Sequence, residues 1–202
     1  MICLEILVEE PSMEVALREI MPNILQGRAR YKLINMGSKG KLIKGLPARL
    51  RGYRRRINNG ENLKVIVLVD KDNDDCRRLK QKMETLAHEA GLTTKASANG
   101  HGDFQVVTRI AIEELESWFI GDTNALKKTF NSLRGANFPK SFRNPDNGGT
   151  WKRLHRFLKR NGIYRKSYPK IEAARKIAKH MDPQHNRSPS FQSFIKGIDA
   201  CL

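Results

Sequence analysis

The stretch that decides the fold is Val65-Ile66-Val67-Leu68-Val69-Asp70-Lys71-Asp72, a run of apolar residues that leads into two acids. An unbroken series of mostly β-branched residues predicts a strand buried on both faces, as at the centre of a parallel sheet. Residues 2–8 and 106–112 form two more apolar runs, and acids follow each of them. Because the carboxyl ends of parallel strands meet at one edge of a sheet, we expect the three groups of acids to converge there.

Helical periodicity fills the intervals between these runs. Apolar residues recur at helical spacing in three long segments, residues 12–25, 42–57 and 76–90. Shorter elements are also expected: a strand near residues 31–34, a turn at 99–102 and a helix at 115–120. Pro47 is expected to interrupt the second long helix. The resulting β-α-β-α-β-α-β order predicts an α/β fold over residues 1–122, a three-layer sandwich with a mostly parallel central sheet and right-handed crossovers.

The character of the chain changes beyond residue 122. Residues 131–150 are rich in Asn, Gly and Pro and are expected to form a long loop, with Thr150 as the N-cap of the next helix. Three helical segments follow, near residues 151–160, 169–180 and 191–202. We expect residues 123–202 to form a basic helical extension that packs beside the α/β core as a cap.

The chain is strongly basic, since 38 Lys and Arg against 21 Asp and Glu give a formal charge of +17. The excess is concentrated in residues 49–56 and 152–179. Clusters of this density are typical of proteins that bind DNA or RNA, although any single charged run can equally be a solvated helix face. The residues expected to bind nucleic acid are Arg49, Arg54, Arg55, Arg56, Lys152, Arg153, Arg156, Arg160 and Arg187.

The composition excludes several other classes of protein. No apolar stretch approaches the roughly 18–20 residues that span a bilayer, and acids stand where a secretory signal would carry basic residues. We therefore expect a cytoplasmic protein that makes no use of a membrane. Cys3, Cys76 and Cys201 are odd in number and widely spaced, which predicts buried thiols and argues against disulfides or a zinc site. Neither G-x-x-x-x-G-K-[ST] nor a G-x-G-x-x-G after the first strand is present, which argues against the common nucleotide-binding folds.

Asp70 and Asp72 give the sharpest chemical signal. Two acids at positions i and i+2, placed where an inner strand ends, direct their oxygens toward one opening, which suits a hard cation such as Mg²⁺. Mn²⁺ is expected to substitute for it. Asp74 either extends this site or belongs, with Asp75, to the cap of the helix that begins near residue 76. The alternative for the whole run is an exposed acidic turn.

The acids after the other two strands are more ambiguous. Glu9 gains weight from its place at a strand end, although it could equally be an exposed acid before a helix. Glu116 either joins the site or belongs to an ordinary acidic helix start. Its neighbour Trp118 is expected to lie in the core and not to act as a base-stacking platform.

Four short segments resemble the Toprim fold, in which a Glu ends the first strand and an Asp-x-Asp ends a later inner strand. They are LVEEPS at residues 7–12, KLIKGLPARL at 41–50, VDKDNDDC at 69–76 and ELESW at 114–118. More narrowly, these segments are similar to those of small bacterial Toprim-like proteins of unknown function, which often lie beside ABC-type ATPases in phage-defence loci. One departure is Glu10, which stands where the family pattern usually carries Gly.

The resemblance implies a Mg²⁺-dependent nuclease that cleaves DNA or RNA and acts with an ABC/OLD-type ATPase in defence against phage. The residues that match by position are the metal ligands Glu9, Asp70 and Asp72, the auxiliary Asp74, and the later acid Glu116 of the small family. Lys170 or Arg187 is expected, from its polar surroundings, to add charge stabilisation to the transition state.

Two other functions stay open on the residues alone. An Asp-x-Asp phosphatase would use Asp70 as a covalent nucleophile, although that motif normally ends the first strand and is followed by a hydroxyl residue. A non-catalytic subunit that binds DNA or RNA would use its acids only for structure. The sequence gives no expectation for the oligomeric state.

Overall fold

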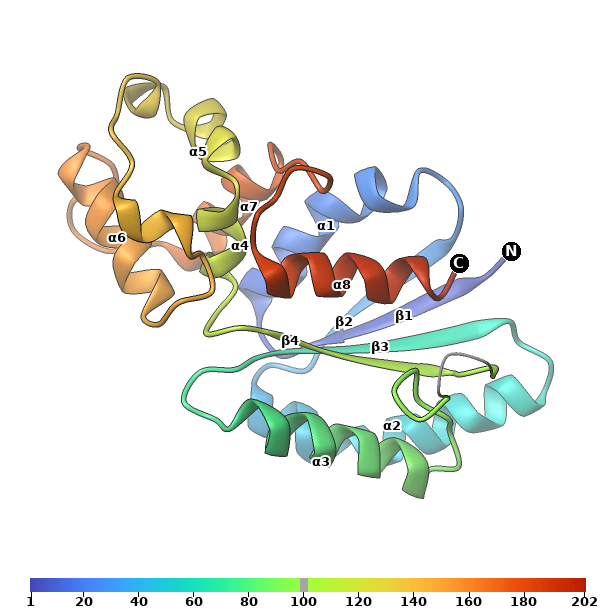
Figure 1. The fold of residues 1–202 in the computed structure, drawn as a ribbon. Coiled ribbons are helices and arrows are strands. Elements are labelled where there is room, and N and C mark those ends of the chain that lie inside the picture. The colour runs from blue at the N-terminus through green and yellow to red at the C-terminus, as the bar shows by residue number, and fades with distance from the viewer. Residues whose placement is uncertain (99–101) are drawn as a thin grey trace.

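The computed structural model describes residues 1–98 and 102–202, so most of the turn expected at 99–102 lies outside the described residues. One sheet of parallel strands forms the centre of the molecule, in the order β2-β1-β3-β4 (Figure 1). The strands are β1 (Cys3–Val8), β2 (Arg30–Asn35), β3 (Leu63–Asp70) and β4 (Val106–Ala111). Two of the three acidic groups therefore follow the inner strands β1 and β3, and the third follows the edge strand β4.

Helices cover both faces of this sheet (Figure 1). On one face lie α2 (Lys39–Asn58) and α3 (Cys76–Glu89), and on the other lie α1 (Pro11–Leu25) and α8 (Pro189–Asp199). The side chains of β3 alternate between the two layers, since Val67 packs with the α2 and α3 side and Leu68 with the α1 side. A strand buried on both faces needs apolar residues at every position, which explains its unbroken apolar run. The expected three-layer α/β fold with a parallel sheet is confirmed.

Local signals set where most helices begin. The Ser38 hydroxyl accepts a hydrogen bond from the Lys41 backbone N–H at 3.2 Å and caps α2. The Asp75 carboxylate caps α3, because it accepts a hydrogen bond from the Arg78 backbone N–H at 2.8 Å. Of the two roles considered for Asp75, metal ligand or helix cap, the structure shows the cap. The expectation that Pro47 interrupts α2 is wrong, because the helix runs through it. Apolar side chains on both sides of Pro47 pack on the sheet, and this tertiary packing outweighs the one lost backbone bond.

Beyond β4 the chain is helical, with short connections. It forms α4 (Glu116–Gly121), α5 (Thr123–Thr129), the 3₁₀ helices η1 (Asn131–Leu133) and η2 (Lys140–Arg143), α6 (Thr150–Arg160), α7 (Lys170–Ala178) and α8. The loop expected at residues 131–150 thus contains both 3₁₀ turns. Thr150 is the first residue of α6 and not its N-cap, which is Gly149 at a φ of 68°. The Thr150 hydroxyl instead donates to Glu114 Oε2 at 2.8 Å.

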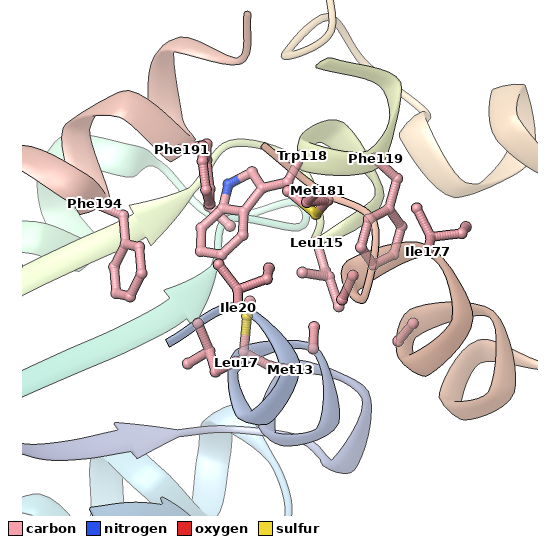
Figure 2. Close-up of a cluster of buried hydrophobic side chains, with 14 of the residues drawn as sticks. Met13, Leu17, Ile20, Leu115, Trp118, Phe119, Ile177, Met181, Phe191 and Phe194 are labelled. Atoms are coloured by element: carbon pink, nitrogen blue, oxygen red, sulfur yellow. The ribbon is translucent and has the colours of Figure 1, made fainter. Parts of the chain in front are cut away.

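The helices after residue 122 share one hydrophobic core with α1 and the sheet. Figure 2 shows this cluster, in which Trp118 and Phe119 of α4 lie between α1 and the C-terminal elements. Trp118 is fully buried, and its ring packs edge-on against Phe191 at 5.0 Å and stacks on Phe194 at 5.2 Å. Its indole N–H donates to Ser190 Oγ at 3.2 Å. The expectation that Trp118 is a core residue is therefore confirmed.

Two smaller points concern the expectations from composition. Within residues 1–98 and 102–202, the structure contains no helix with the length and apolar character needed to cross a bilayer. All three cysteines are free, but only Cys201 is buried. Cys3 is the first residue of β1 and Cys76 is the first residue of α3. Both lie at the ends of their elements and are partly exposed, so the expectation of buried thiols is wrong for these two.

Candidate metal centre

Glu9 and Asp70 lie together at the carboxyl ends of the two inner strands. Their side chains are 5% and 3% exposed. Glu9 Oε1 accepts a hydrogen bond from the Asp70 backbone N–H at 2.9 Å, which joins the two strand ends. One oxygen of each carboxyl group, Glu9 Oε2 and Asp70 Oδ1, is buried and has no hydrogen-bond partner among the described residues. Buried polar atoms are normally satisfied, so these two oxygens require an explanation.

The electrostatics of this pair disfavour two ionised carboxylates. Burial raises the pKa of Glu9 to about 7, and it raises the pKa of Asp70 well above its usual range, with Glu9 and Glu116 adding repulsion. Desolvation and like charges both disfavour an ionised carboxylate. A cation between the two groups would remove both penalties, and carboxylate oxygens are the ligands that Mg²⁺ and Mn²⁺ prefer.

Glu116 and Lys170 extend the centre toward the C-terminal helices. Glu116 begins α4 and is 2% exposed, and burial raises its pKa to about 7 although Lys170 opposes this. Burial would lower the pKa of Lys170, but the carboxylates of Glu10 and Glu116 outweigh it and raise that pKa. Tyr168 adds a buried hydroxyl without a hydrogen-bond partner in the part of the chain that is described. Its pKa is raised by burial and by Glu116.

Asp72 and Asp74 already have a cation, the ammonium group of Lys39. Lys39 Nζ lies 2.7 Å from Asp72 Oδ2, 2.8 Å from Asp74 Oδ2 and 3.1 Å from the Lys71 carbonyl oxygen. The side chain of Lys39 is 17% exposed, whereas those of Asp72 and Asp74 are about half exposed. Burial would lower the pKa of Lys39, but its two aspartate partners raise it. Lys39 was not among the predicted site residues, because its ion pairs join the start of α2 to the segment that follows β3.

The fit to a metal ion differs between these two groups of acids. In residues 1–98 and 102–202, no three His, Cys, Asp or Glu side chains are arranged closely enough to hold a metal ion as the structure stands. Glu9 and Asp70 supply two free, hard oxygen donors, which fit Mg²⁺. Asp72 and Asp74 could each supply a further oxygen ligand once the carboxylate is released from its ion pair with Lys39.

The basic residues expected to bind nucleic acid fall into two classes. Arg56 and Arg153 are occupied inside the protein. The Arg56 guanidinium forms ion pairs with Glu5 at 2.6 Å and Glu61 at 2.8 Å. The Arg153 guanidinium donates to the carbonyl oxygens of the loop before α6, among them that of Asn144 at 3.1 Å. These two arginines hold structure together, which makes them poor phosphate ligands.

The other basic candidates face solvent or lie partly buried. The exposed ones are Arg49, Arg55, Lys152, Arg156, Arg160 and Arg187, and Arg54 is half-buried. Arg187 follows α7, and its backbone N–H donates to the Gly121 carbonyl at 3.0 Å. A cavity of about 660 Å³ between α2 and α3 adds cations that the sequence did not single out, since Lys44, Arg78 and Lys82 line it beside Lys39.

Glu114, for which the sequence suggested no role, caps α6 although it lies far from that helix in the sequence. Its Oε2 accepts hydrogen bonds from the Trp151 backbone N–H at 2.9 Å and from the Thr150 hydroxyl. A carboxylate at a helix N-terminus is stabilised by the helix dipole. This contact fixes the start of α6 beside the acidic edge of the sheet, an arrangement that no local sequence pattern could indicate.

The comparisons with known proteins agree with this architecture. A family described as "Domain of unknown function (DUF4276)" matches residues 8–199. No curated protein matches the chain. Among solved structures, the C-terminal region of the Burkholderia pseudomallei OLD protein is similar, with a TM-score of 0.51 and 13% identity over 98% of each chain. At that identity the likeness shows the fold, and it agrees with the expected Toprim-like α/β architecture. The chain thus belongs to the DUF4276 family.

Proposed function

We propose that this protein is a metal-dependent nuclease that hydrolyses the phosphodiester backbone of DNA or RNA. The observation that carries the proposal is the pair of buried, unpartnered carboxylate oxygens of Glu9 and Asp70 at the ends of the inner strands. The chain carries a formal charge of +17, so its surface attracts a polyanion, whereas the buried acidic centre would repel the phosphates of that polyanion. A divalent cation bound by the acids would remove this repulsion.

In this proposal, Glu9 and Asp70 hold Mg²⁺ or Mn²⁺, and Asp72 and Asp74 join as ligands once Lys39 releases them. When bound, the ion supplies Lewis-acid stabilisation of the phosphate and lowers the pKa of an attacking water. One metal ion or two would both be consistent with this ligand set.

The remaining groups of the centre act on the substrate directly. Glu116, whose pKa is about 7, can take up or release a proton near neutral pH, which is the property required of a general acid or base. The Lys170 ammonium is near enough to Glu10 and Glu116 for their charges to raise its pKa, and it would stabilise negative charge on the phosphate. Exposed cations of α6, namely Lys152, Arg156 and Arg160, would hold the phosphates that flank the cleaved bond.

We also propose that the nuclease works in the cytoplasm with a separate ABC/OLD-type ATPase, in defence against phage. Support comes from the sequence resemblance to small Toprim-like proteins and from the fold match to the C-terminal region of an OLD protein. The phosphatase alternative is less well supported, because the Asp-x-Asp motif follows β3 and not the first strand, and Asn73-Asp74-Asp75 stands where that motif normally carries a hydroxyl residue.

A cleavage assay tests the proposal. Labelled single-stranded DNA, single-stranded RNA and plasmid are incubated with the protein in Mn²⁺, in Mg²⁺ and in EDTA, with and without the ATPase encoded nearest to it. We expect metal-dependent cleavage of at least one polynucleotide by the wild type and none by Asp70→Asn. Asp199→Asn, a change at an exposed acid near the end of α8, is the matched control and should cleave like the wild type. Hydrolysis of small phosphomonoesters alone would support the phosphatase.

A further inference from the structure

The second tryptophan of the chain lies beside the acidic centre. Trp118 is fully buried, whereas Trp151 is only partly buried and lines a cavity of about 220 Å³. Asp72, Glu113 and Glu114 line the same cavity. An aromatic ring that is left partly exposed beside this acidic edge of the sheet can contact a ligand there.

Contacts with Glu114 and His155 hold Trp151 in place. It is the second residue of α6, and its backbone N–H is held by Glu114 at 2.9 Å. The ring stacks against His155 one turn later, with a centroid distance of 6.5 Å and an interplanar angle of 17°. Lys152 Nζ lies 5.9 Å from the indole centroid. The indole is therefore presented on a rigid element, with a positive charge close to it.

The charge of the cavity lining favours a neutral, planar ligand over a phosphate group. Three carboxylates and one lysine line the cavity. Each carboxylate bonds to the protein through one oxygen, and its other oxygen could accept a hydrogen bond from the amino group of a nucleobase. The volume of the cavity is below the roughly 300–1,000 Å³ of pockets that hold drug-sized molecules, which suits a single base. Phosphates on either side of that base would meet the exposed cations of α6.

We propose that this cavity is a nucleobase subsite, in which one base of a single-stranded nucleic acid stacks on the indole of Trp151. The proposal rests on the proposed function for the presence of a polynucleotide at the acidic centre. Because Asp72 lines the cavity and lies two residues after Asp70 of the candidate metal centre, the stacked base belongs to a nucleotide near the cleaved bond. Paired bases in a duplex have no free face, so the subsite favours single strands.

The intrinsic fluorescence of the protein tests the stacking. The chain contains two tryptophans, and the buried Trp118 serves as an internal reference. In EDTA, a mixed-sequence 12-nucleotide single strand should quench the emission of the wild type, and it should leave Trp151→Phe, which retains only Trp118, unquenched. An abasic strand of the same length carries the same phosphates and should quench neither protein.

Binding of the same strands measured by anisotropy separates stacking from charge. Trp151→Ala should weaken binding of the single strand by about 5- to 150-fold, the range typical of one stacked base, and binding of duplex by less than about twofold. Trp151→Phe keeps an aromatic face and should stay within a few-fold of the wild type. The salt dependence should be unchanged in both variants, because no phosphate contact is lost.

The outcomes for the subsite and for the nuclease are distinct. Equal quenching by the abasic strand, or wild-type affinity in Trp151→Ala, would overturn the subsite. Cleavage in Mn²⁺ without quenching would overturn the subsite and keep the nuclease. Quenching by the single strand without any cleavage would support the subsite and overturn the nuclease.

Discussion

Two groups of acids lie at the carboxyl edge of the same sheet, and they differ in how their charge is balanced. Asp72 and Asp74 are about half exposed and form ion pairs with Lys39 at 2.7 and 2.8 Å. Glu9 and Asp70 are buried, repel one another and each keep an oxygen without a partner among the described residues. The contrast shows that Lys39 balances the charge of the exposed pair, whereas no cation of the described residues pairs with the buried one.

The largest effect should follow from removing the charge of the deeper pair. Asp70→Asn or Glu9→Gln is expected to lower metal-dependent cleavage at least about 100-fold, a loss typical of one group that stabilises charge in the transition state. The same changes relieve repulsion between buried carboxylates, so both variants should be at least as stable as the wild type in EDTA. Single-turnover cleavage and chemical denaturation measure the two effects. A variant that is inactive because it is unfolded would not support the role of the pair.

The deeper pair should also give the metal-free protein an unusual pH dependence. In the unfolded chain Glu9 and Glu116 lose their protons near pH 4.5, whereas in the folded protein they keep them to about pH 7. The folded state binds more protons in this window, so the free energy of unfolding falls as pH rises through it. The fall should be about 3 kcal/mol for Glu9 alone. The charged groups around Glu9 are those of Lys39, Asp70, Asp72 and Glu10.

Denaturation in EDTA between pH 4.5 and 8 measures this dependence. Mn²⁺ favours the ionised carboxylates and should reduce the loss of stability at the upper end of the range. Glu9→Gln should flatten the profile in EDTA, and Asp199→Asn should leave it unchanged. A wild-type stability that rises across the whole window would contradict the raised pKa values.

The contrast between satisfied and free charges extends to the basic residues of α6. Arg153 is bonded to the carbonyl oxygens of its own loop, whereas Arg156, one turn later, is exposed. Arg153→Ala is expected to lower the free energy of unfolding by about 1 to 3 kcal/mol. Arg156→Ala should leave stability within about 0.5 kcal/mol and reduce the salt dependence of nucleic-acid binding. The reverse pattern in denaturation and binding titrations would show that the two roles are exchanged.

The smallest expected change in stability follows from replacing Lys39, whose ammonium group pairs with Asp72 and Asp74. Lys39→Met removes the partner of Asp72 and Asp74, and the expected loss of stability in EDTA is about 0.5 to 1 kcal/mol because both acids are half exposed. Both acids then become available as ligands, so Mn²⁺ should bind more tightly than in the wild type. Calorimetric titration measures this change, with Lys44→Met on the same helix as the control. Weaker binding of Mn²⁺ by Lys39→Met would show that Lys39 does not compete with the metal.

The sequence predicted the fold and the position of the acids because both depend on local patterns. The apolar run before Asp70 indicates a central strand, and topology then places Glu9 and Asp70 at one edge. Pro47 was judged wrongly, because the packing of α2 against the sheet is a tertiary effect. Thr150 was misplaced by one position, because its hydroxyl bonds to Glu114 from a distant segment.

The contacts that distinguish the two groups of acids could not be predicted. Lys39 lies in a Gly- and Lys-rich segment that resembles a flexible connection, and only the fold brings its ammonium group to Asp72. The same holds for Arg153, whose loop partners carry no sequence signal, and for Trp151, whose exposure depends on how α6 is docked. Periodicity reports which face of an element is buried, and it does not report which charged groups meet across elements.

The central claim is that Glu9 and Asp70 form a site for a divalent cation, and thermal unfolding with Mn²⁺ tests it most directly. At a hundredfold excess of free Mn²⁺ over its dissociation constant, the wild type should gain about 2.7 kcal/mol of stability, and its Tm should rise accordingly. Asp70→Asn should show a much smaller rise, and Asp199→Asn should follow the wild type. An equal rise in the wild type and Asp70→Asn, or no rise in the wild type at any Mn²⁺ concentration, would contradict the claim.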